Sequence, residues 1–417
     1  MRTGKYEIVQ QGWFKMKEIE SVPWKIIPTN TNFDPQGNRK PLEQDKWGAQ
    51  SFPALCNQLK PDIVWTLADV YMVEHMSFLR NQLGYKYIQY LEIDGTPTPL
   101  RYEKTLNAAE LSIVSSEFGA DAVEDLTGVK PAMIYHGVDN NIFHPYAEDK
   151  KQKLREAVNP DILNSFIIGW VGKDQTRKNP WNLFETIYYL KTGNYINCNS
   201  CDRVTRGIYN RQKRSIASIP TECKYCKSTD VSPGESIEDL RLWMHAYNQA
   251  NIGWDFNLHR DMWGLGNTVI FTSKLTQDSG LKTSEMSDLY NMFDLFVSLS
   301  GGEGFGIPLI EAQACGLPVV YTDYTAQPEI SKKGGLSVDC ELYPEPISSI
   351  DRGFIDINHA IKQIYSLYKN KELYKTLSSN GRIDMLSRFD HDLLATQHHE
   401  LIQQVVSRPR KMIGVSV

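Results

Sequence analysis

The sequence predicts an α/β protein of two domains, each built around a parallel β-sheet. Apolar segments typical of buried strands alternate along the chain with helix-like segments, which is the order expected when helices join parallel strands. The chain has 417 residues, which is longer than a single domain with one hydrophobic core usually is, so two domains are expected. A glycine-rich turn between a strand and a helix, at residues 301–307, is typical of ligand-binding turns in such sheets.

The first domain is expected over residues 1–150. Its helices are predicted at residues 98–109 and 117–127. Its strands are predicted at residues 6–13, 24–30, 62–67, 86–93, 111–116 and 132–137. The segment 144–165 is polar and charged, so we place the domain boundary within it.

The second domain, residues 151–390, opens with the apolar strand "SFIIGWVG" (165–172). A helix is predicted over 179–191, and strict alternation predicts a strand over 239–247. A buried strand at 291–300 is followed by a helix that starts at Pro308 and stops at Gly316. Residues 391–417 form a C-terminal segment with an amphipathic helix, which we expect to brace the first domain, and a tail.

The stretch "GGEGFGIPLIEAQACG" (301–316) combines strand end, glycine turn and helix start. Glycines let the backbone approach a ligand, and the first amides of a helix lack internal partners, so the turn suits an anion such as a diphosphate. Glu303 and Glu311 would repel phosphate but can accept hydrogen bonds from sugar hydroxyls on either side of it. The pattern therefore favours a nucleotide-sugar site. An ordinary strand–helix turn with surface glutamates is the alternative.

Composition excludes some classes of protein. A content of 41% hydrophobic and 23% charged residues fits a globular protein, and a net charge of −5 argues against binding nucleic acid over the whole surface. No apolar run reaches the length of a membrane span, and "MRTGKYEIVQQGW" lacks the apolar core of a signal peptide. A cytoplasmic protein without a transmembrane segment is the prediction.

Three motifs occur in the order and spacing of a known family: "HGVDNNIFHP" (136–145), "GWVGKDQTRKN" (169–179) and "GGEGFGIPLIEAQACGLPVVYTDYTAQPEI" (301–330). Together they resemble the family 4 retaining glycosyltransferases, over most of residues 60–330. The resemblance implies the GT-B architecture, two facing Rossmann-like domains, and hexosyl transfer from a nucleotide-sugar with retention of the anomeric configuration. It implies no catalytic metal.

The resemblance also assigns roles to residues. Glu303 and Glu311, spaced as Glu-x7-Glu, are similar to the glutamates that face the transferred sugar and the nucleotide ribose. Lys178 is similar to the lysine that neutralises the leaving phosphate, and Lys173 takes the companion basic position, where the family usually has arginine. The backbone amides expected to meet the diphosphate are those of Gly304, Phe305, Gly306 and Ile307.

The chain departs from the family pattern in its first domain. Many members place a histidine near the sugar, whereas the corresponding stretch "YIQYLEIDGTPTP" offers Asp94. Asp94 can accept a hydroxyl's hydrogen bond or proton, or it is a turn aspartate before Gly95. Asp69 and His75 are weaker candidates on the acceptor side.

The family's opening strand and glycine-rich loop are a second departure. Gly4, Gly12 and Gly37 are isolated, so this unit is predicted to be missing. The departure leaves open a noncatalytic nucleotide-sugar-binding protein of the same fold.

An insert at residues 193–236 has no counterpart in the family. Its segment "CNSCDRVTRGIYNRQKRSIASIPTECKYC" (198–226) holds two Cys-x2-Cys pairs separated by 21 residues. Four thiolates in this arrangement fit a structural zinc ion, with iron or disulfides as alternatives. The predicted ligands are Cys198, Cys201, Cys223 and Cys226, and the other cysteines, Cys56, Cys315 and Cys340, are scattered.

The insert is also basic between its cysteine pairs. The residues concerned are Arg203, Arg206, Arg211, Lys213 and Arg214. They are either a solvated rim or a contact for a phosphate-bearing acceptor, nucleic acid or a partner, so a nucleic-acid-directed protein also stays open. The sequence leaves the acceptor open among glycan, lipid-linked and nucleic-acid classes, and it does not indicate an oligomeric state.

Overall fold

A computed structural model describes residues 47–246, 254–272, 280–346 and 348–409, together with four short strands before residue 42. The predictions on Gly4, Gly37 and the tail beyond residue 409 lie outside the described residues. The chain divides into two compact units. Unit 1 comprises Met1–Ile93, Pro97–Tyr135 and Asp392–Val417, and unit 2 comprises Asp94–Thr96 and His136–His391.

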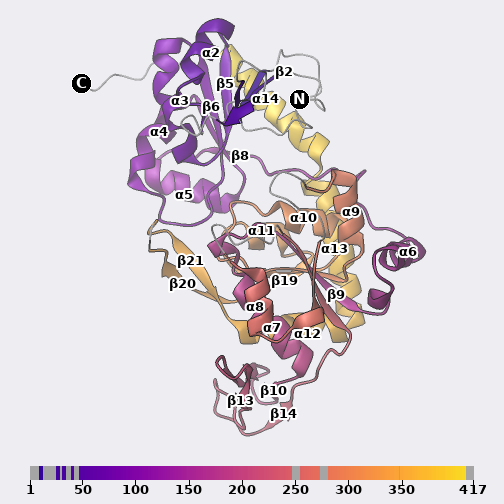
Figure 1. Ribbon diagram of the computed structural model, residues 1–417. Coiled ribbons are helices and arrows are strands. Elements are labelled where there is room, and N and C mark those ends of the chain that lie inside the picture. The colour runs from indigo at the N-terminus through magenta and orange to yellow at the C-terminus, as the bar shows by residue number, and fades with distance from the viewer. Residues whose placement is uncertain are drawn as a thin grey trace. The chain divides into compact units, whose positions relative to one another are not determined.

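Unit 1 is built on a parallel sheet in the order β5-β6-β7-β8 (Figure 1). The strands are β5 (Ile63–Leu67), β6 (Lys86–Leu91), β7 (Leu111–Val114) and β8 (Ala132–Met133). The last is shorter than the predicted 132–137. Two further pairs are β1 (Val9–Gly12) with β2 (Lys25–Pro28), parallel, and β3 (Thr31–Phe33) with β4 (Arg39–Pro41), antiparallel.

Helices cover both faces of the unit 1 sheet, which explains its apolar strands. They are α2 (Phe52–Leu59), α3 (Val70–Leu83), α4 (Glu103–Ala108), α5 (Glu117–Thr127) and α14 (His391–Ser407). Along β6, Ile88 and Tyr90 pack with Leu394 and Val405 of α14. The Lys86 ammonium donates to the carbonyls at the end of α14, so the last helix is fixed to the sheet of this unit.

Unit 2 contains a six-stranded sheet in the order β16-β15-β9-β17-β18-β19, with every neighbouring pair parallel. The strands are β9 (Phe166–Val171), β15 (Leu240–His245), β16 (Val269–Phe271), β17 (Leu295–Ser298), β18 (Val319–Thr322) and β19 (Gly335–Val338). Alternate residues of the central strands, such as Ile168 and Leu242, join one large core with α7 (Pro180–Thr192), α8 (Phe256–Met262) and α12 (Ile357–Lys369). The predicted second α/β domain is therefore present.

The remaining helices of unit 2 include α9 (Thr283–Asn291), α10 (Ile307–Ala314), α11 (Gln327–Ser331) and α13 (Lys371–Arg388). Helix α10 contacts β17 and β18, and α11 contacts β18 and β19. Helix α6 (Glu148–Val158) follows the start of the unit, and a hairpin joins β20 (Cys340–Pro344) to β21 (Asp351–Ile355). In the part of the chain that is described, no helix is both long and apolar enough to cross a membrane.

The predicted insert forms its own small β-structure between α7 and β15. Strands β11 (Val204–Arg206), β10 (Tyr195–Cys198) and β14 (Val231–Pro233) make an antiparallel sheet, and β12 (Ile208–Asn210) with β13 (Ser215–Ser218) makes a hairpin. The core sheet on either side of the insert stays continuous, since β9 and β15 pair over six residues. The insertion therefore leaves the order of the main sheet intact.

Candidate functional site

Two neighbouring strands of the unit 2 sheet deliver the predicted site. β9 and β17 pair in parallel, with Leu295 opposite Ile168 and Phe296 opposite Gly169. The carboxyl ends of parallel strands meet at one edge of a sheet, where ligands of α/β proteins are usually bound. The turn after β9 carries Lys178, and the turn after β17 carries Glu303, so the register of this pair brings the two motifs together.

The turn after β9 contains a single 3₁₀ segment, Thr176–Lys178, before helix α7 begins. Asn179 has a φ of 47°, which reverses the chain, and Pro180 then takes an early helical position where its missing N–H costs nothing. The Asn179 side chain donates to the carbonyl of Gly353. This tight turn fixes the two consecutive cations, Arg177 and Lys178, close to the end of the sheet.

The turn after β17 leads into α10 through the glycine loop. Gly306 has a φ of 110°, in the region that favours glycine, immediately before the helix begins at Ile307. A Cβ on Gly302 would lie 2.2 Å from the backbone oxygen of Asp94. The loop therefore needs glycine at one position for its backbone angle and at the other for close approach.

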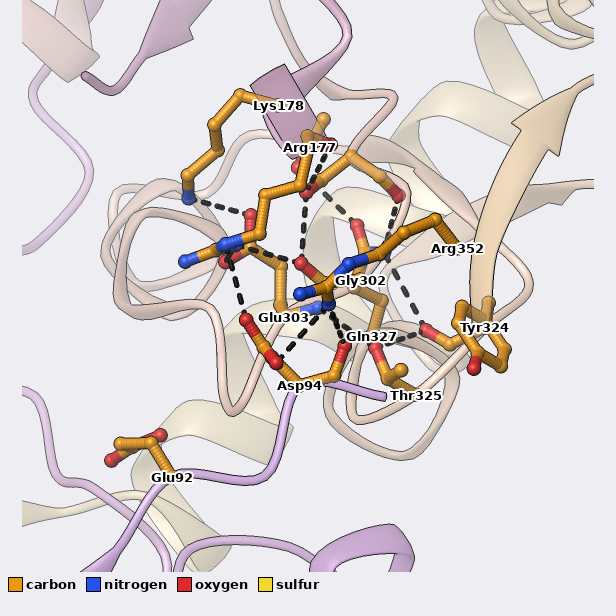
Figure 2. Close-up of polar contacts among 12 residues, drawn as sticks. Glu92, Asp94, Arg177, Lys178, Gly302, Glu303, Tyr324, Thr325, Gln327 and Arg352 are labelled. Atoms are coloured by element: carbon orange, nitrogen blue, oxygen red, sulfur yellow. Dashed lines mark hydrogen bonds and ion pairs between the residues drawn. The ribbon is translucent and has the colours of Figure 1, made fainter. Parts of the chain in front are cut away.

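Hydrogen bonds join the two turns and hold the loop (Figure 2). The Gly301 amide donates to the Arg177 carbonyl at 2.7 Å. Gln327 donates from Nε2 to the Ser300 carbonyl at 3.1 Å, and the amide of Glu303 donates to Oγ1 of Thr325 at 2.9 Å. With its backbone held in this way, the loop positions the Glu303 carboxylate accurately.

Glu303 is buried and lies between two cations (Figure 2). Its Oε1 accepts a hydrogen bond from Nζ of Lys178 at 2.6 Å, and its Oε2 accepts one from Nη1 of Arg177 at 2.8 Å. Nη1 of Arg177 also donates to the carbonyl of Gly302 at 2.7 Å. Both carboxylate oxygens are therefore engaged by charged donors, which is the arrangement that makes a buried carboxylate tolerable.

Asp94 completes the network within the same unit. Its Oδ2 lies 3.2 Å from Nε of Arg177, and its Oδ1 lies 3.1 Å from Nη1 of Arg352, a buried residue of the β20–β21 hairpin. Nη1 of Arg352 also donates to the Asp94 backbone carbonyl at 2.6 Å. Arg177 is thus shared between Asp94 and Glu303, and Asp94 is fixed through both its backbone and its carboxylate.

The electrostatics of the network follow from this packing. Burial by itself would raise the pKa of Glu303, but the Lys178 ammonium and the Arg177 guanidinium together lower it to about 2. Burial lowers the pKa of Lys178, and the Glu303 carboxylate opposes that effect. Glu303 therefore stays ionised at neutral pH, and the charge state of the network is fixed by mutual pairing.

Glu311 lies on α10 and outside this network. Its Oε2 accepts a hydrogen bond from the hydroxyl of Tyr290, a fully buried residue of α9, at 2.8 Å. Among the described residues it forms no ion pair. Burial raises the pKa of Glu311 to about 7, and the Tyr290 hydrogen bond opposes the rise only in part.

The structure separates the two basic residues predicted from the motif after β9. Lys178 contacts Glu303, whereas Lys173 is exposed and, within the described residues, forms no ion pair with Asp94 or Glu303. Arg177 and Arg352 are the cations that the sequence reasoning missed. Arg177 directly precedes Lys178 in "TRKN", so the motif contained its signal, but no motif marks Arg352.

Most of the remaining residues predicted for the site form the glycine loop itself. Gly304, Phe305 and Gly306 precede Ile307, the first residue of α10. The Phe305 ring is buried and packs edge-on against His136, with ring centroids 5.1 Å apart. This contact brings the start of the motif "HGVDNNIFHP" beside the glycine loop. Asp69 and His75 belong to unit 1, at the cap and within helix α3.

The four predicted cysteines gather in the insert. The Sγ atoms of Cys198, Cys201, Cys223 and Cys226 all lie within 4.8 Å of one another. The sulfurs of Cys198 and Cys226 are 3.5 Å apart and those of Cys201 and Cys223 are 3.6 Å apart, far beyond a disulfide bond of about 2.05 Å. Four thiolates around a metal at about 2.3 Å would be separated by about 3.8 Å, so the cluster fits a tetrahedral metal ion.

One segment of the chain matches a known protein family. Residues 263–384, which include β17, the glycine loop and α10, match the family Glycosyl transferases group 1. By this match the segment is glycosyltransferase-like. It contains Glu303, Glu311 and Arg352 and excludes Lys178 and the cysteine insert.

Relatives agree with this match. The N-acetyl-alpha-D-glucosaminyl L-malate synthase of Bacillus anthracis is 26% identical over 125 residues, 30% of this chain and 30% of that protein, so the chain aligns with less than a third of this curated relative. The solved structure of sucrose-phosphate synthase from Thermosynechococcus elongatus has a TM-score of 0.67 and 17% identity, over 96% of this chain and 89% of that chain. Anabaena HepE, solved with UDP and glucose, has a TM-score of 0.63 and 15% identity, over 93% and 88%. The fold is GT-B, as predicted.

The pKa of Glu311 makes a prediction about stability. The pKa of Glu311 rises from 4.5 to about 7 on folding. The free energy of unfolding therefore falls as the pH rises from about 4.5 to about 7, because the folded state must then ionise a buried acid. Glu311→Gln keeps an acceptor for Tyr290 and removes the charge. We expect the free energy of unfolding of this variant to exceed that of the unchanged protein by about 2 kcal/mol at pH 8 and to equal it at pH 4.5. The difference at pH 8 is reduced because the side chain is partly exposed to solvent. Calorimetric unfolding at both pH values measures this, and an equal difference at the two would contradict it.

Proposed function

We propose that this chain is a retaining glycosyltransferase that moves a hexose from a nucleotide-sugar to an acceptor. The observation that carries the proposal is the junction of two motifs at one sheet edge. There Lys178 and Arg177, from the turn after β9, meet Glu303 and the glycine loop that opens α10. A cation pair beside a helix start suits a diphosphate, and carboxylates beside it suit sugar hydroxyls.

The diphosphate of the donor is assigned to the loop and the cations. The amides of Gly304, Phe305, Gly306 and Ile307 point their dipoles at it, as the first turn of a helix does for anions. Both cations contact Glu303, and donor binding would give them a second anion to share. We assign Lys178 to the leaving phosphate and keep Lys173, at its exposed position, as a second candidate.

The carboxylates are assigned to hydroxyl groups. Glu303 would accept from the transferred sugar, and Glu311 from the ribose, with Tyr290 holding one Glu311 oxygen and leaving the other available. Asp94 would accept a hydroxyl's hydrogen bond or proton, held in place by Arg177 and Arg352. None of these roles requires a catalytic metal.

Retention is proposed to follow front-face attack. The bond between the anomeric carbon and the phosphate oxygen breaks while the acceptor oxygen bonds to the same face, and the departing phosphate takes the acceptor's proton. Most of the catalysis is then electrostatic, because negative charge develops on the diphosphate opposite Lys178 and the loop amides. The side chains preorganised by the network need no large movement to supply this stabilisation.

We further propose that the cysteine cluster binds zinc in a structural role. Four thiolate ligands leave no open position for chemistry, and the spacing of the sulfurs fits Zn²⁺. Unpaired cysteines throughout the described residues are also in keeping with a reducing compartment such as the cytoplasm.

The first test is donor binding. We expect one class among UDP-, GDP- and ADP-sugars to raise the melting temperature, since a ligand that binds only the folded state stabilises it by mass action. Release of free nucleotide from that donor, even with water as acceptor, would mark an enzyme. Binding without release would favour a noncatalytic protein, and DNA binding with no response to any donor would favour a nucleic-acid-directed one.

Substitutions of the basic residues test the assignment of the leaving phosphate. We expect Lys178→Ala to lower kcat for nucleotide release by about 100- to 1000-fold, equivalent to about 3 kcal/mol, and Lys178→Arg to lower it far less, because charge matters most there. Lys173→Ala is the matched control on the same turn. If it costs as much as Lys178→Ala, the exposed lysine takes part in catalysis and the assignment to the Glu303 network is wrong.

Metal analysis tests the cysteine cluster. Purified protein should contain about one zinc per chain, and Cys223→Ser should release it and lower the melting temperature. Cys340→Ser, outside the cluster, is the control and should leave the metal content unchanged. Protein without metal whose cluster cysteines are oxidised to disulfides would refute the zinc site.

A further inference from the structure

The metal-binding insert carries a charge opposite to that of the chain. The insert, residues 193–236, contains seven basic and four acidic side chains, a formal charge of +3, whereas the whole chain carries −5. Five of the basic side chains lie within residues 203–214, which contain no acidic side chain. A bound zinc with four thiolates would remove about two of these charges. When positive side chains are concentrated on a small element, the electrostatic potential there is more favourable for anions than on the rest of the surface.

The insert is fixed along the length of helix α7. At the last turns, the Tyr189 hydroxyl donates to the Gly207 carbonyl at 2.7 Å, and the Tyr188 and Tyr209 rings pack at 4.9 Å. One turn earlier, Glu185 pairs with Arg206 at 3.0 Å.

The β12–β13 hairpin then reaches the first turn of the same helix. The Arg211 guanidinium stacks over the Trp181 ring at 4.6 Å. Residues spaced by three and four share one face of a helix, so the hairpin runs back along α7 from its end to its start. Trp181 comes three residues after Lys178 in the chain.

The turn of this hairpin, residues 211–214, presents its cations to solvent. Arg211, Lys213 and Arg214 are exposed, and within the described residues none of them forms an ion pair. Two acids interact electrostatically with these cations, Glu185 with Arg211 and Asp261 with Arg214, but each is paired with another arginine, Glu185 with Arg206 at 3.0 Å and Asp261 with Arg260 at 2.8 Å. The stack on Trp181 holds the Arg211 guanidinium in place.

The neighbouring rings do not offer a platform for nucleobases. Tyr209 packs on Trp263 with centroids 4.4 Å apart, and its hydroxyl donates to the Met262 carbonyl. Sites for single-stranded nucleic acid combine cations with rings on which bases stack. In the turn itself the described residues 211–214 are all polar, so the surface suits phosphate groups and not bases.

We propose that the turn 211–214 binds phosphate groups of the acceptor, and that the acceptor is a phosphate-bearing glycan. The inference rests on the proposed function, which supplies the transfer reaction at the Lys178 turn. The cysteine cluster and α7 hold the basic turn at the start of the helix that follows Lys178. An acceptor bound there by its phosphates is anchored next to the element that neutralises the donor's leaving group. Specificity for the acceptor then comes from the insert, and donor recognition from the glycine loop.

A pair of double variants tests this on the full chain with end-labelled inorganic polyphosphate as the probe. Arg211→Gln with Arg214→Gln removes two charges from the turn. Lys224→Gln with Lys227→Gln removes two charges from the second cysteine pair and serves as the matched control. This pair contacts the start of α12, where Asn358 donates to the Tyr225 hydroxyl. We expect the turn variant to weaken binding about tenfold at about 50 mM salt and to flatten the salt dependence, with the control close to the unchanged protein.

Two further measurements keep the outcomes distinct. Zinc content and the donor-induced rise in melting temperature should be the same in both variants, because neither touches the cluster ligands or the glycine loop. If no donor binds to the unchanged protein, the proposed function fails while the polyphosphate result still reports on the turn. Equal weakening by both variants, or absence of binding, overturns the proposal. Tighter binding of an oligothymidylate of equal charge also overturns it, in favour of nucleic acid.

Discussion

A buried carboxylate at the end of β17 governs the arrangement of the site. Ionised Glu303 is tolerable there only because Lys178 and Arg177 engage both of its oxygens. Arg177 also pairs with Asp94, and Asp94 pairs with Arg352. The buried carboxylate is therefore part of one ion-pair network that joins several separate stretches of unit 2. Glu303 and Asp94 each have two cationic partners, so removing one cation would leave a carboxylate with half of its compensation. The members of the network therefore depend on one another, unlike the two residues of an isolated surface pair.

Backbone contacts make this network possible. The amide of Gly301 bonds to the carbonyl of Arg177, and Gly302 approaches the Asp94 carbonyl so closely that a side chain has no room. The glycines of the loop thus have two roles, since they also let the chain turn into α10 at Gly306. The turn that we propose binds the diphosphate is therefore also the structural connection between the ends of β9 and β17.

Much of this was predictable from the sequence, and the failures have physical causes. The strand, glycine loop and helix around Glu303 were readable because local glycine and apolar patterns determine them, and paired cysteines predict their own proximity. That Arg177 contacts both Glu303 and Asp94 was not predicted, because this depends on the path of the backbone through the 3₁₀ segment Thr176–Lys178. Arg352 and the Tyr290–Glu311 pair depend on long-range packing that leaves no local signature. Strand β8 ends at Met133, but the prediction of an apolar segment beyond it has a basis, because Ile134 is buried and its amide donates to the Val114 carbonyl of β7.

Helix α7 illustrates how an insertion changes the sequence that surrounds it. The sheet covers one side of the helix and the insert covers much of another, and nine of its thirteen residues are buried. A related chain without the insert would lose a partner at three aromatic residues of this helix. Arg211 stacks on Trp181, the Tyr209 ring packs on Tyr188, and the Gly207 carbonyl accepts from the Tyr189 hydroxyl. The amino acids on this side of the helix and those of the insert therefore constrain each other.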